Sequence, residues 1–208
     1  MTLEELTARY GLQLITPELA YLPATERPLS ADVFLAEHDG QRFAYDAGAS
    51  DEAAELLRAA EPAALILSHF HADHSGNLAR LSFPTVYTGA LRERHYENQI
   101  IVEEPKLLCS DGTLRLIPTP SSHSKGSLLF LAGEYLLTGD ALYNRWKDGR
   151  ALYNVQRLRA LMDNIAQSGC RYVIESHRED PVCTAEEALV FLRGIYDRRR
   201  PGESVIEL

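Results

Sequence analysis

The sequence predicts an α+β fold in which two β-rich halves, each finished by helices, form sheets packed together with the helices outside. Short apolar strands alternate with short helices along the 208 residues. No period recurs, no stretch is low in complexity, and no linker separates the two halves. We therefore expect a single domain spanning residues 1–208.

The first half is expected to contain four strands. They cover residues 31–36, 41–46, 64–67 and 85–88. Asp39-Gly40 is typical of a hairpin turn and joins the first two strands. Ser50 is typical of a helix N-cap, and the helix that follows is expected to end near Glu61 because Pro62 comes next. The continuous apolar run 64–67 predicts a strand buried on both faces.

The second half is expected to contain four more strands and two helices. The strands cover residues 114–117, 127–131, 135–138 and 172–175. Asn154 is expected to cap a helix that carries Leu158 and Leu161 on one apolar face. Thr184, with Glu187 three residues later, forms the pattern of a capping box and predicts a last helix.

Composition and charge exclude several classes of protein. Hydrophobic residues make up 45% of the chain and charged residues 25%, which excludes a disordered chain. The formal net charge of −9 argues against a nucleic-acid-binding protein. The three cysteines are odd in number and form no Cys-x-x-Cys pair, which fits a reducing compartment. Since no apolar run approaches the ~20 residues of a membrane helix, we expect a soluble, cytoplasmic protein without a membrane partner.

The segment from Ser68 to Asn77 contains a cluster of side chains that are typical of a functional site. Three histidines and one aspartate fall within its six positions 69–74, although the whole chain holds only seven histidines. Imidazole and carboxylate are ligands that Zn²⁺ and similar metals prefer. A structural zinc site normally recruits cysteine, and this segment has none. The spacing therefore predicts a metal site, with room for two adjacent ions.

The pattern His69-x-His71-x-Asp73-His74 resembles the signature of the metallo-β-lactamase-fold hydrolases. Four further segments match that family's pattern in order along the chain: Asp46-Ala47-Gly48, Thr119–Ser127 around His123, Thr138-Gly139-Asp140, and Ile174–His177. The segment around His123 has one extra residue and lacks the usual glycine, and Ser176 stands where glycine is more common. The resemblance implies a four-layer αββα sandwich of the metallo-β-lactamase type.

The resemblance also implies a dinuclear metal centre. One metal would be held by His69, His71 and His123, and the other by Asp73, His74 and His177. Asp140 would bridge the two, opposite a bridging hydroxide that acts as the nucleophile. Asp73 is expected to be a catalytic residue as well as a metal ligand. Zinc is the expected metal, with iron and manganese as alternatives.

Asp46 has two interpretations that the sequence leaves open. A carboxylate at the end of a strand can accept a hydrogen bond from a metal-binding histidine. It can equally cap the turn in which it lies.

Residues after Asp140 are the candidates for substrate recognition. With an aspartate at position 140, the sequence resembles the glyoxalase-II, lactonase and phosphodiesterase branches of the family. Tyr143 follows three residues later, a spacing that resembles the acyl-homoserine lactonases, in which a tyrosine helps to stabilise the oxyanion; ordinary aromatic packing is the alternative. Arg145 and Trp146 are candidates to line the pocket mouth, with an exposed loop as the alternative. Residues 88–106 are a candidate lid.

These observations favour a hydrolase that cleaves a small acyl ester, lactone or thioester. A phosphodiesterase of the same fold is one alternative, because two metals act equally well on a phosphoryl group. A module that retains metals for binding or regulation, with little turnover, is the other. The expected partner is a small-molecule substrate, and a homodimer is one option for the assembly.

Overall fold

The computed structural model describes residues 1–90 and 95–208, and the chain divides into two compact units. Unit 1 comprises Met1–Thr88, the described part of Arg92–Ile101, and the loop Ser176–Glu179. Unit 2 comprises the remaining described residues, chiefly Val102–Glu175 and Asp180–Leu208.

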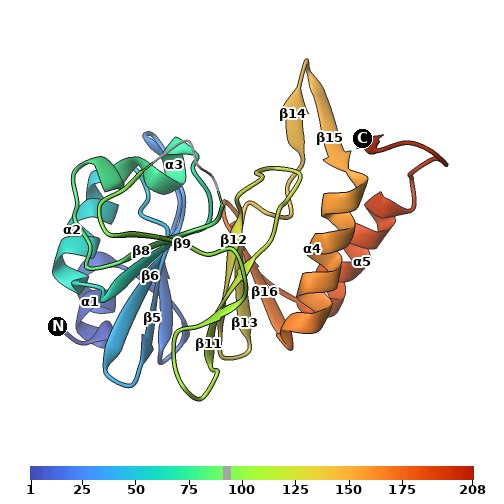
Figure 1. Cartoon of the computed structure of the whole chain (residues 1–208). Coiled ribbons are helices and arrows are strands. Elements are labelled where there is room, and N and C mark those ends of the chain that lie inside the picture. The colour runs from blue at the N-terminus through green and yellow to red at the C-terminus, as the bar shows by residue number, and fades with distance from the viewer. Residues whose placement is uncertain (91–94) are drawn as a thin grey trace. The chain divides into compact units, whose positions relative to one another are not determined.

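Unit 1 is a seven-stranded sheet with helices on one face (Figure 1). Its helices are α1 (Leu3–Tyr10), α2 (Asp51–Ala60), the short α3 (Ala72–Ser75) and the 3₁₀ turn η1 (Gly76–Ala79). Its strands are β1 (Gln13–Thr16), β2 (Leu19–Leu22), β5 (Val33–His38), β6 (Gln41–Tyr45), β7 (Ala64–Leu67), β8 (Val86–Thr88) and β9 (Gln99–Ile101), in the order β1-β2-β5-β6-β7-β8-β9. A separate small hairpin pairs β3 (Thr25–Glu26) with β4 (Leu29–Ser30).

The core of unit 1 lies between its sheet and helices α1 and α2. Leu6 of α1 and Leu56 of α2 pack in one cluster with Leu35 and Leu65 from the strands. Several predictions for this half are confirmed. Strands β5 and β6 form the hairpin expected at Asp39-Gly40, β7 is buried along its whole length, and the Ser50 side chain caps α2.

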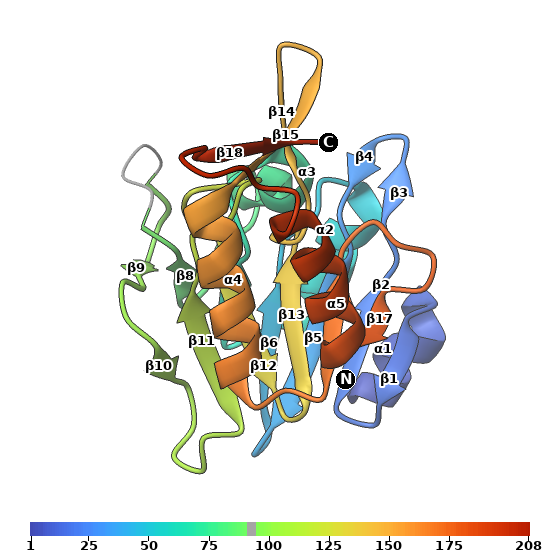
Figure 2. The same cartoon turned by 90° about the vertical axis from the view of Figure 1, so that its right-hand side faces the viewer.

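Unit 2 contains a six-stranded sheet in the order β10-β11-β12-β13-β16-β17 and a small sheet in the order β14-β15-β18. The larger sheet is built from β10 (Lys106–Leu107), β11 (Leu114–Pro118), β12 (Leu128–Ala132), β13 (Tyr135–Gly139), β16 (Tyr172–Glu175) and β17 (Val182–Thr184). The smaller one is built from β14 (Arg145–Lys147), β15 (Arg150–Asn154) and β18 (Val205–Glu207). Helices α4 (Val155–Ser168) and α5 (Ala185–Tyr196) lie side by side on one face of the larger sheet (Figure 2).

Both predicted helix starts in unit 2 are confirmed. The Asn154 side chain accepts a hydrogen bond from the backbone N–H of Arg157 at the start of α4. At α5 the capping box is complete, because Thr184 and Glu187 each accept a hydrogen bond from the other's backbone N–H. Residues 145–147, for which an exposed loop was the alternative to lining a pocket, form strand β14, which pairs with β15 in an exposed hairpin.

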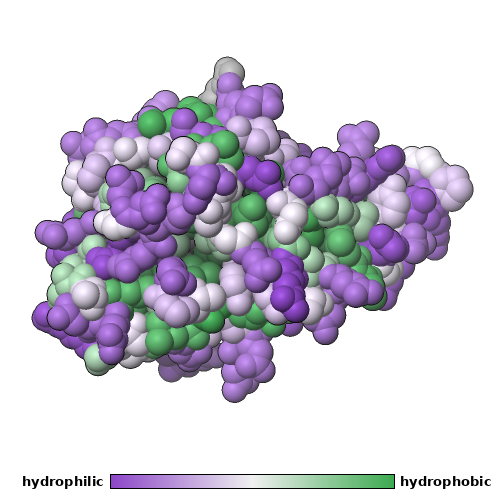
Figure 3. Space-filling model, turned by 90° about the horizontal axis from the view of Figure 1, so that it is seen from below, coloured by the Kyte–Doolittle hydropathy of each residue, from purple (hydrophilic) through white to green (hydrophobic). Residues whose placement is uncertain are grey.

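On the face drawn in Figure 3, hydrophilic residues are interspersed with smaller hydrophobic areas. Among the described residues, no helix is long and apolar enough to cross a membrane.

Candidate metal centre

The histidine-rich segment lies directly after the buried strand β7. His71 occupies the N-cap position of α3, and its carbonyl oxygen accepts hydrogen bonds from the backbone N–H and the hydroxyl of Ser75. This turn places Asp73 and His74 within α3 while His69 stays buried in the preceding loop. The rings of His69 and His71 are in contact, with centroids 4.4 Å apart.

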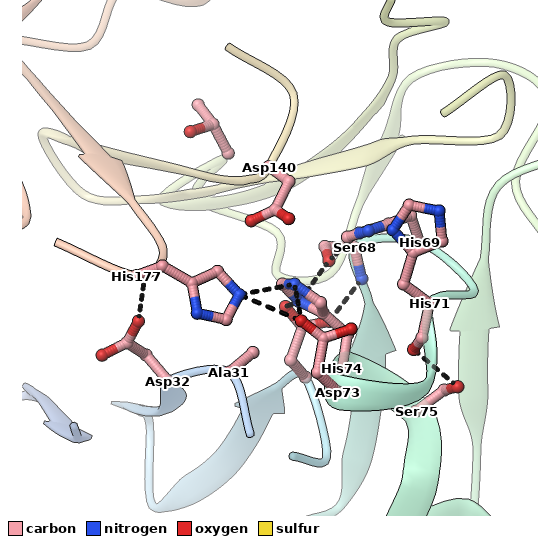
Figure 4. A network of polar contacts seen from close by, with 12 residues as sticks. Ala31, Asp32, Ser68, His69, His71, Asp73, His74, Ser75, Asp140 and His177 are labelled. Carbon is pink, nitrogen blue, oxygen red and sulfur yellow. Dashed lines mark hydrogen bonds and ion pairs between the residues drawn. The ribbon is translucent and has the colours of Figure 1, made fainter. Parts of the chain in front are cut away.

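Three ligand atoms of unit 1 converge on one point (Figure 4). Nε2 of His177 lies 3.3 Å from Nε2 of His74 and 3.1 Å from Oδ2 of Asp73. Nε2 of His74 and Oδ2 of Asp73 are 3.6 Å apart. Ligands about 2.0–2.1 Å from a tetrahedral Zn²⁺ are separated by about 3.3 Å. The donor set, two imidazoles and a carboxylate, therefore fits a divalent metal both in chemistry and in spacing.

The partners of His74 show which atom it offers. Oδ2 of Asp46 lies 2.7 Å from Nδ1 of His74, and both side chains are fully buried. Because a carboxylate only accepts, Nδ1 carries a proton, and Nε2 is the atom that His74 offers toward Asp73 and His177, where a metal would take the place of a proton. The other oxygen of Asp46 accepts the backbone N–H of Ser68 at 2.8 Å. Asp46 thus accepts from a histidine, as the first interpretation expects, and its second oxygen ties the end of β6 to the segment after β7 instead of capping the turn in which Asp46 lies.

Asp73 is held as a carboxylate. Burial alone would raise the pKa of its side chain, but the hydrogen bond from His177 and the charge of His74 outweigh it and lower the pKa to about 2. An ionised Asp73 supplies the negative charge that a cation at this point requires.

His177 is fixed by a residue that the sequence analysis did not single out. Oδ2 of Asp32 accepts the backbone N–H of His177 at 2.8 Å, and Oδ1 accepts the N–H of Ala24 at 2.9 Å. His177 itself adopts a left-handed backbone conformation, with φ +63°. Asp32 is only 1% exposed, and burial raises the pKa of its carboxyl group. The available signal was an acidic residue at the start of an apolar strand, where a buried charge requires partners.

We expect Asp32→Asn to destabilise the fold by about 1–3 kcal/mol, because one N–H donor would then face the amide nitrogen instead of an acceptor. Urea denaturation of the metal-free protein measures this loss. Asp180→Asn, at an exposed position three residues after His177, removes the same charge and is expected to change stability by less than about 0.5 kcal/mol. Equal losses in the two variants would show that Asp32 acts only through its charge.

Unit 2 contains a second, smaller group of predicted ligands. Nε2 of His123 lies 3.3 Å from Oδ2 of Asp140, a residue 6% exposed. Nδ1 of His123 lies 3.2 Å from the carbonyl oxygen of Asn144, so Nδ1 donates and Nε2 turns its lone pair toward Asp140. Two acceptors that face each other at this distance need a cation or a proton between them. The ring of Tyr143 contacts the His123 ring edge-on, with centroids 6.4 Å apart.

The remaining predicted residues lie in exposed or partly described regions. Arg145 and Trp146 are on strand β14, and Trp146 is 70% exposed. Of the candidate lid 88–106, residues 91–94 lie outside the part of the chain that the structure describes, and these include two of its arginines. The other lid residues include strand β9 and the start of β10.

Comparison with known proteins shows the fold class of the chain. Residues 27–100 match the family model described as the metallo-beta-lactamase superfamily. The DIM-1 metallo-beta-lactamase is structurally similar over 89% of this chain and 96% of its own, with a TM-score of 0.70 and 15% sequence identity. The chain is a metallo-β-lactamase-fold protein. The α+β fold of this type, expected from the sequence, is thereby confirmed.

Two further similar proteins carry different descriptions. The chemotaxis sensor ODP, solved as a peroxy diiron species, is similar over 88% of this chain and 94% of its own, with a TM-score of 0.65 and 12% identity. A hydroxyacylglutathione hydrolase from Klebsiella pneumoniae is 29% identical over 119 residues. That match covers 53% of this metallo-β-lactamase-fold chain and 46% of the hydrolase, so the chain spans less than half of this relative.

Proposed function

We propose that this protein is a metal-dependent hydrolase that cleaves a small acyl ester, lactone or thioester at a dinuclear centre. The observation that carries the proposal is the convergence of His74, His177 and Asp73 on one point at metal-ligand spacing. The similarity to a hydroxyacylglutathione hydrolase supports a hydrolase of acyl compounds. We further propose that the two units together form one domain, in the cytoplasm, where all three cysteines stay free.

The proposed ligands follow the order of the family's motifs along the chain. They form two sets: His69, His71 and His123 for one metal, and Asp73, His74 and His177 for the other. Asp140 would be shared by both. We propose zinc as the metal, with iron and manganese as alternatives, because imidazole and carboxylate accept all three.

The chain's own side chains prepare the site for this chemistry. When bound, divalent metals lower the pKa of water and polarise a carbonyl oxygen. Asp46 fixes the His74 ring, and Asp32 fixes the backbone of His177, so that two ligands are oriented before any metal arrives. The phenol of Tyr143 would donate a hydrogen bond to the oxyanion that develops on the substrate. Arg145 and Trp146 would contact the substrate at the mouth of the pocket.

The proposal is tested by initial hydrolysis rates of zinc-loaded and manganese-loaded protein. The two substrates are an acyl-homoserine lactone and S-lactoylglutathione, and chelator-treated protein is the control. We expect metal-dependent turnover, with the lactone preferred, and Tyr143→Phe to slow lactone opening about tenfold while the metal content stays unchanged. An unchanged rate would reduce Tyr143 to a packing role, and a preference for the thioester would indicate a compact glyoxalase-II-like enzyme.

A regulatory module that retains metals is the second candidate. The structural similarity to the diiron chemotaxis sensor ODP favours it, because the same fold serves there in a sensor. Metal-loaded protein without turnover on esters, lactones, thioesters and phosphodiesters would support this function. Turnover on a phosphodiester such as bis(p-nitrophenyl) phosphate, alone among these, would instead identify a phosphodiesterase.

A further inference from the structure

Helix α5 carries apolar side chains on the face that its own unit leaves uncovered. Its inward residues, among them Leu192 and Ile195, are buried in the core of unit 2. On the outward face, Val190 is 62% exposed and Phe191 is 49% exposed. Helix α4, which is described along its whole length and lies beside α5 in Figure 2, exposes no large hydrophobic residue. The apolar surface is therefore a property of α5 and not of the whole helical face.

A glycine continues this surface, and neither its backbone conformation nor packing within the described chain requires glycine there. Gly194 lies inside α5, one turn after Val190 and Phe191, and it does not have a positive φ. A Cβ added at Gly194 would meet no described atom within 4 Å. A glycine in a helix interior costs about 0.5–1 kcal/mol relative to alanine. Its position is instead suited to the close approach of a second helix.

Helix α5 is acidic at its start and basic at its end, so it is complementary in charge to an antiparallel copy of itself. Glu186 and Glu187 occupy the first turn, and Arg193 and Arg198 lie at the other end. Within the described residues, the side chains of Glu186, Arg193 and Arg198 form no ion pair. An antiparallel copy of the same helix would bring each acidic end beside a basic end.

We propose that the stripe formed by Glu187, Val190, Phe191 and Gly194 is a dimerisation surface that takes α5 of a second copy of this chain. The two helices run antiparallel about a two-fold axis that passes between Val190 and Phe191. Each Phe191 then packs on the partner's Val190, and each Gly194 lies beside the partner's Glu187. Glu186 and Arg193 of opposite copies come within reach of each other on the rim.

The size of this surface sets the expected affinity. One helix pair buries less than the 1,200–2,000 Å² or so of a standard protein–protein interface. We therefore expect a weak, reversible dimer with a dissociation constant on the order of 10 μM, rather than an obligate one. This proposal is independent of the proposed hydrolase function.

Sedimentation velocity of the full chain from about 1 to 500 μM tests the proposal. We expect a concentration-dependent monomer–dimer equilibrium that Phe191→Glu weakens by more than about tenfold. Gln156→Glu, at an exposed position in the first turn of α4, adds the same charge elsewhere on the helical face and should leave the equilibrium unchanged. Circular dichroism confirms that the variants are folded. Sedimentation as a monomer throughout the range, or a dimer that Phe191→Glu does not weaken, overturns the proposal.

A charge exchange tests the geometry of the dimer without touching its apolar centre. Glu186→Arg and Arg193→Glu should each weaken dimerisation several-fold, because each places like charges on opposite copies next to each other. The double variant restores opposite charges and should return the affinity to within about twofold of the original. Failure of the double variant to recover would exclude the antiparallel arrangement.

Discussion

Replacing Asp46 with alanine is expected to lower the zinc affinity of the protein by about 10–100-fold and its stability by roughly 3 kcal/mol. The fully buried His74 loses the carboxylate that orients its ring, and Nδ1 exchanges an acceptor at 2.7 Å for the more distant hydroxyl of Ser68 at 3.3 Å. The backbone N–H of Ser68 loses its acceptor as well. Zinc titration calorimetry measures the first effect, and urea denaturation of the metal-free protein measures the second.

Asp39→Ala is the matched control for this substitution. Asp39 and Asp46 both adopt a left-handed backbone conformation, with φ +48° and +64°, but Asp39 lies exposed in the β5–β6 turn. Alanine therefore introduces the same kind of backbone strain at both sites. Only Asp46 also loses buried hydrogen bonds. Similar losses of stability in the two variants would show that backbone conformation, and not the carboxylate, makes Asp46 important.

Local sequence signals predicted the elements whose start and end depend on neighbouring residues. Ser50, Asn154 and Thr184 each cap a helix as expected, because a capping side chain acts within three residues of its own position. The apolar run 64–67 is a buried strand as expected, since its composition allows no solvent-facing side. The resemblance to a known family depended on the same local motifs.

Features that depend on distant partners escaped prediction. The hydrogen bond between Asp32 and His177 joins residues 145 positions apart. The strand around Asp32 indicates that its carboxylate needs partners, but not that His177 is one of them. Helix α1 and strands β1 and β2 were not assigned, because their short, mixed segments gain stability only by packing on the rest of unit 1. The exposed hairpin of β14 and β15 has a third strand, β18, that comes from the end of the chain. Pairing between strands so far apart in the chain produces no pattern of alternating residues in either segment from which it could be predicted.

Asp140→Asn is expected to reduce the bound metal from two ions to at most one per chain and to lower kcat by about 100-fold. The reason rests on the proposed function. Two neighbouring cations repel each other, and a shared carboxylate offsets that repulsion, whereas a neutral amide does not. Oδ2 of Asp140 lies 3.3 Å from Nε2 of His123, another proposed ligand. Metal analysis by mass spectrometry, together with steady-state kinetics, measures both effects.

Asp148→Asn supplies the control, because Asp148 belongs to the same unit but lies exposed in the β14–β15 turn. It removes one negative charge without touching a predicted ligand, so metal content and kcat should both stay unchanged. An Asp140→Asn protein that still binds two metals and turns over at the full rate would refute the dinuclear assignment. Loss of one metal with full turnover would place the reaction at a single ion, which the proposed ligands Asp73, His74 and His177 of unit 1 would hold.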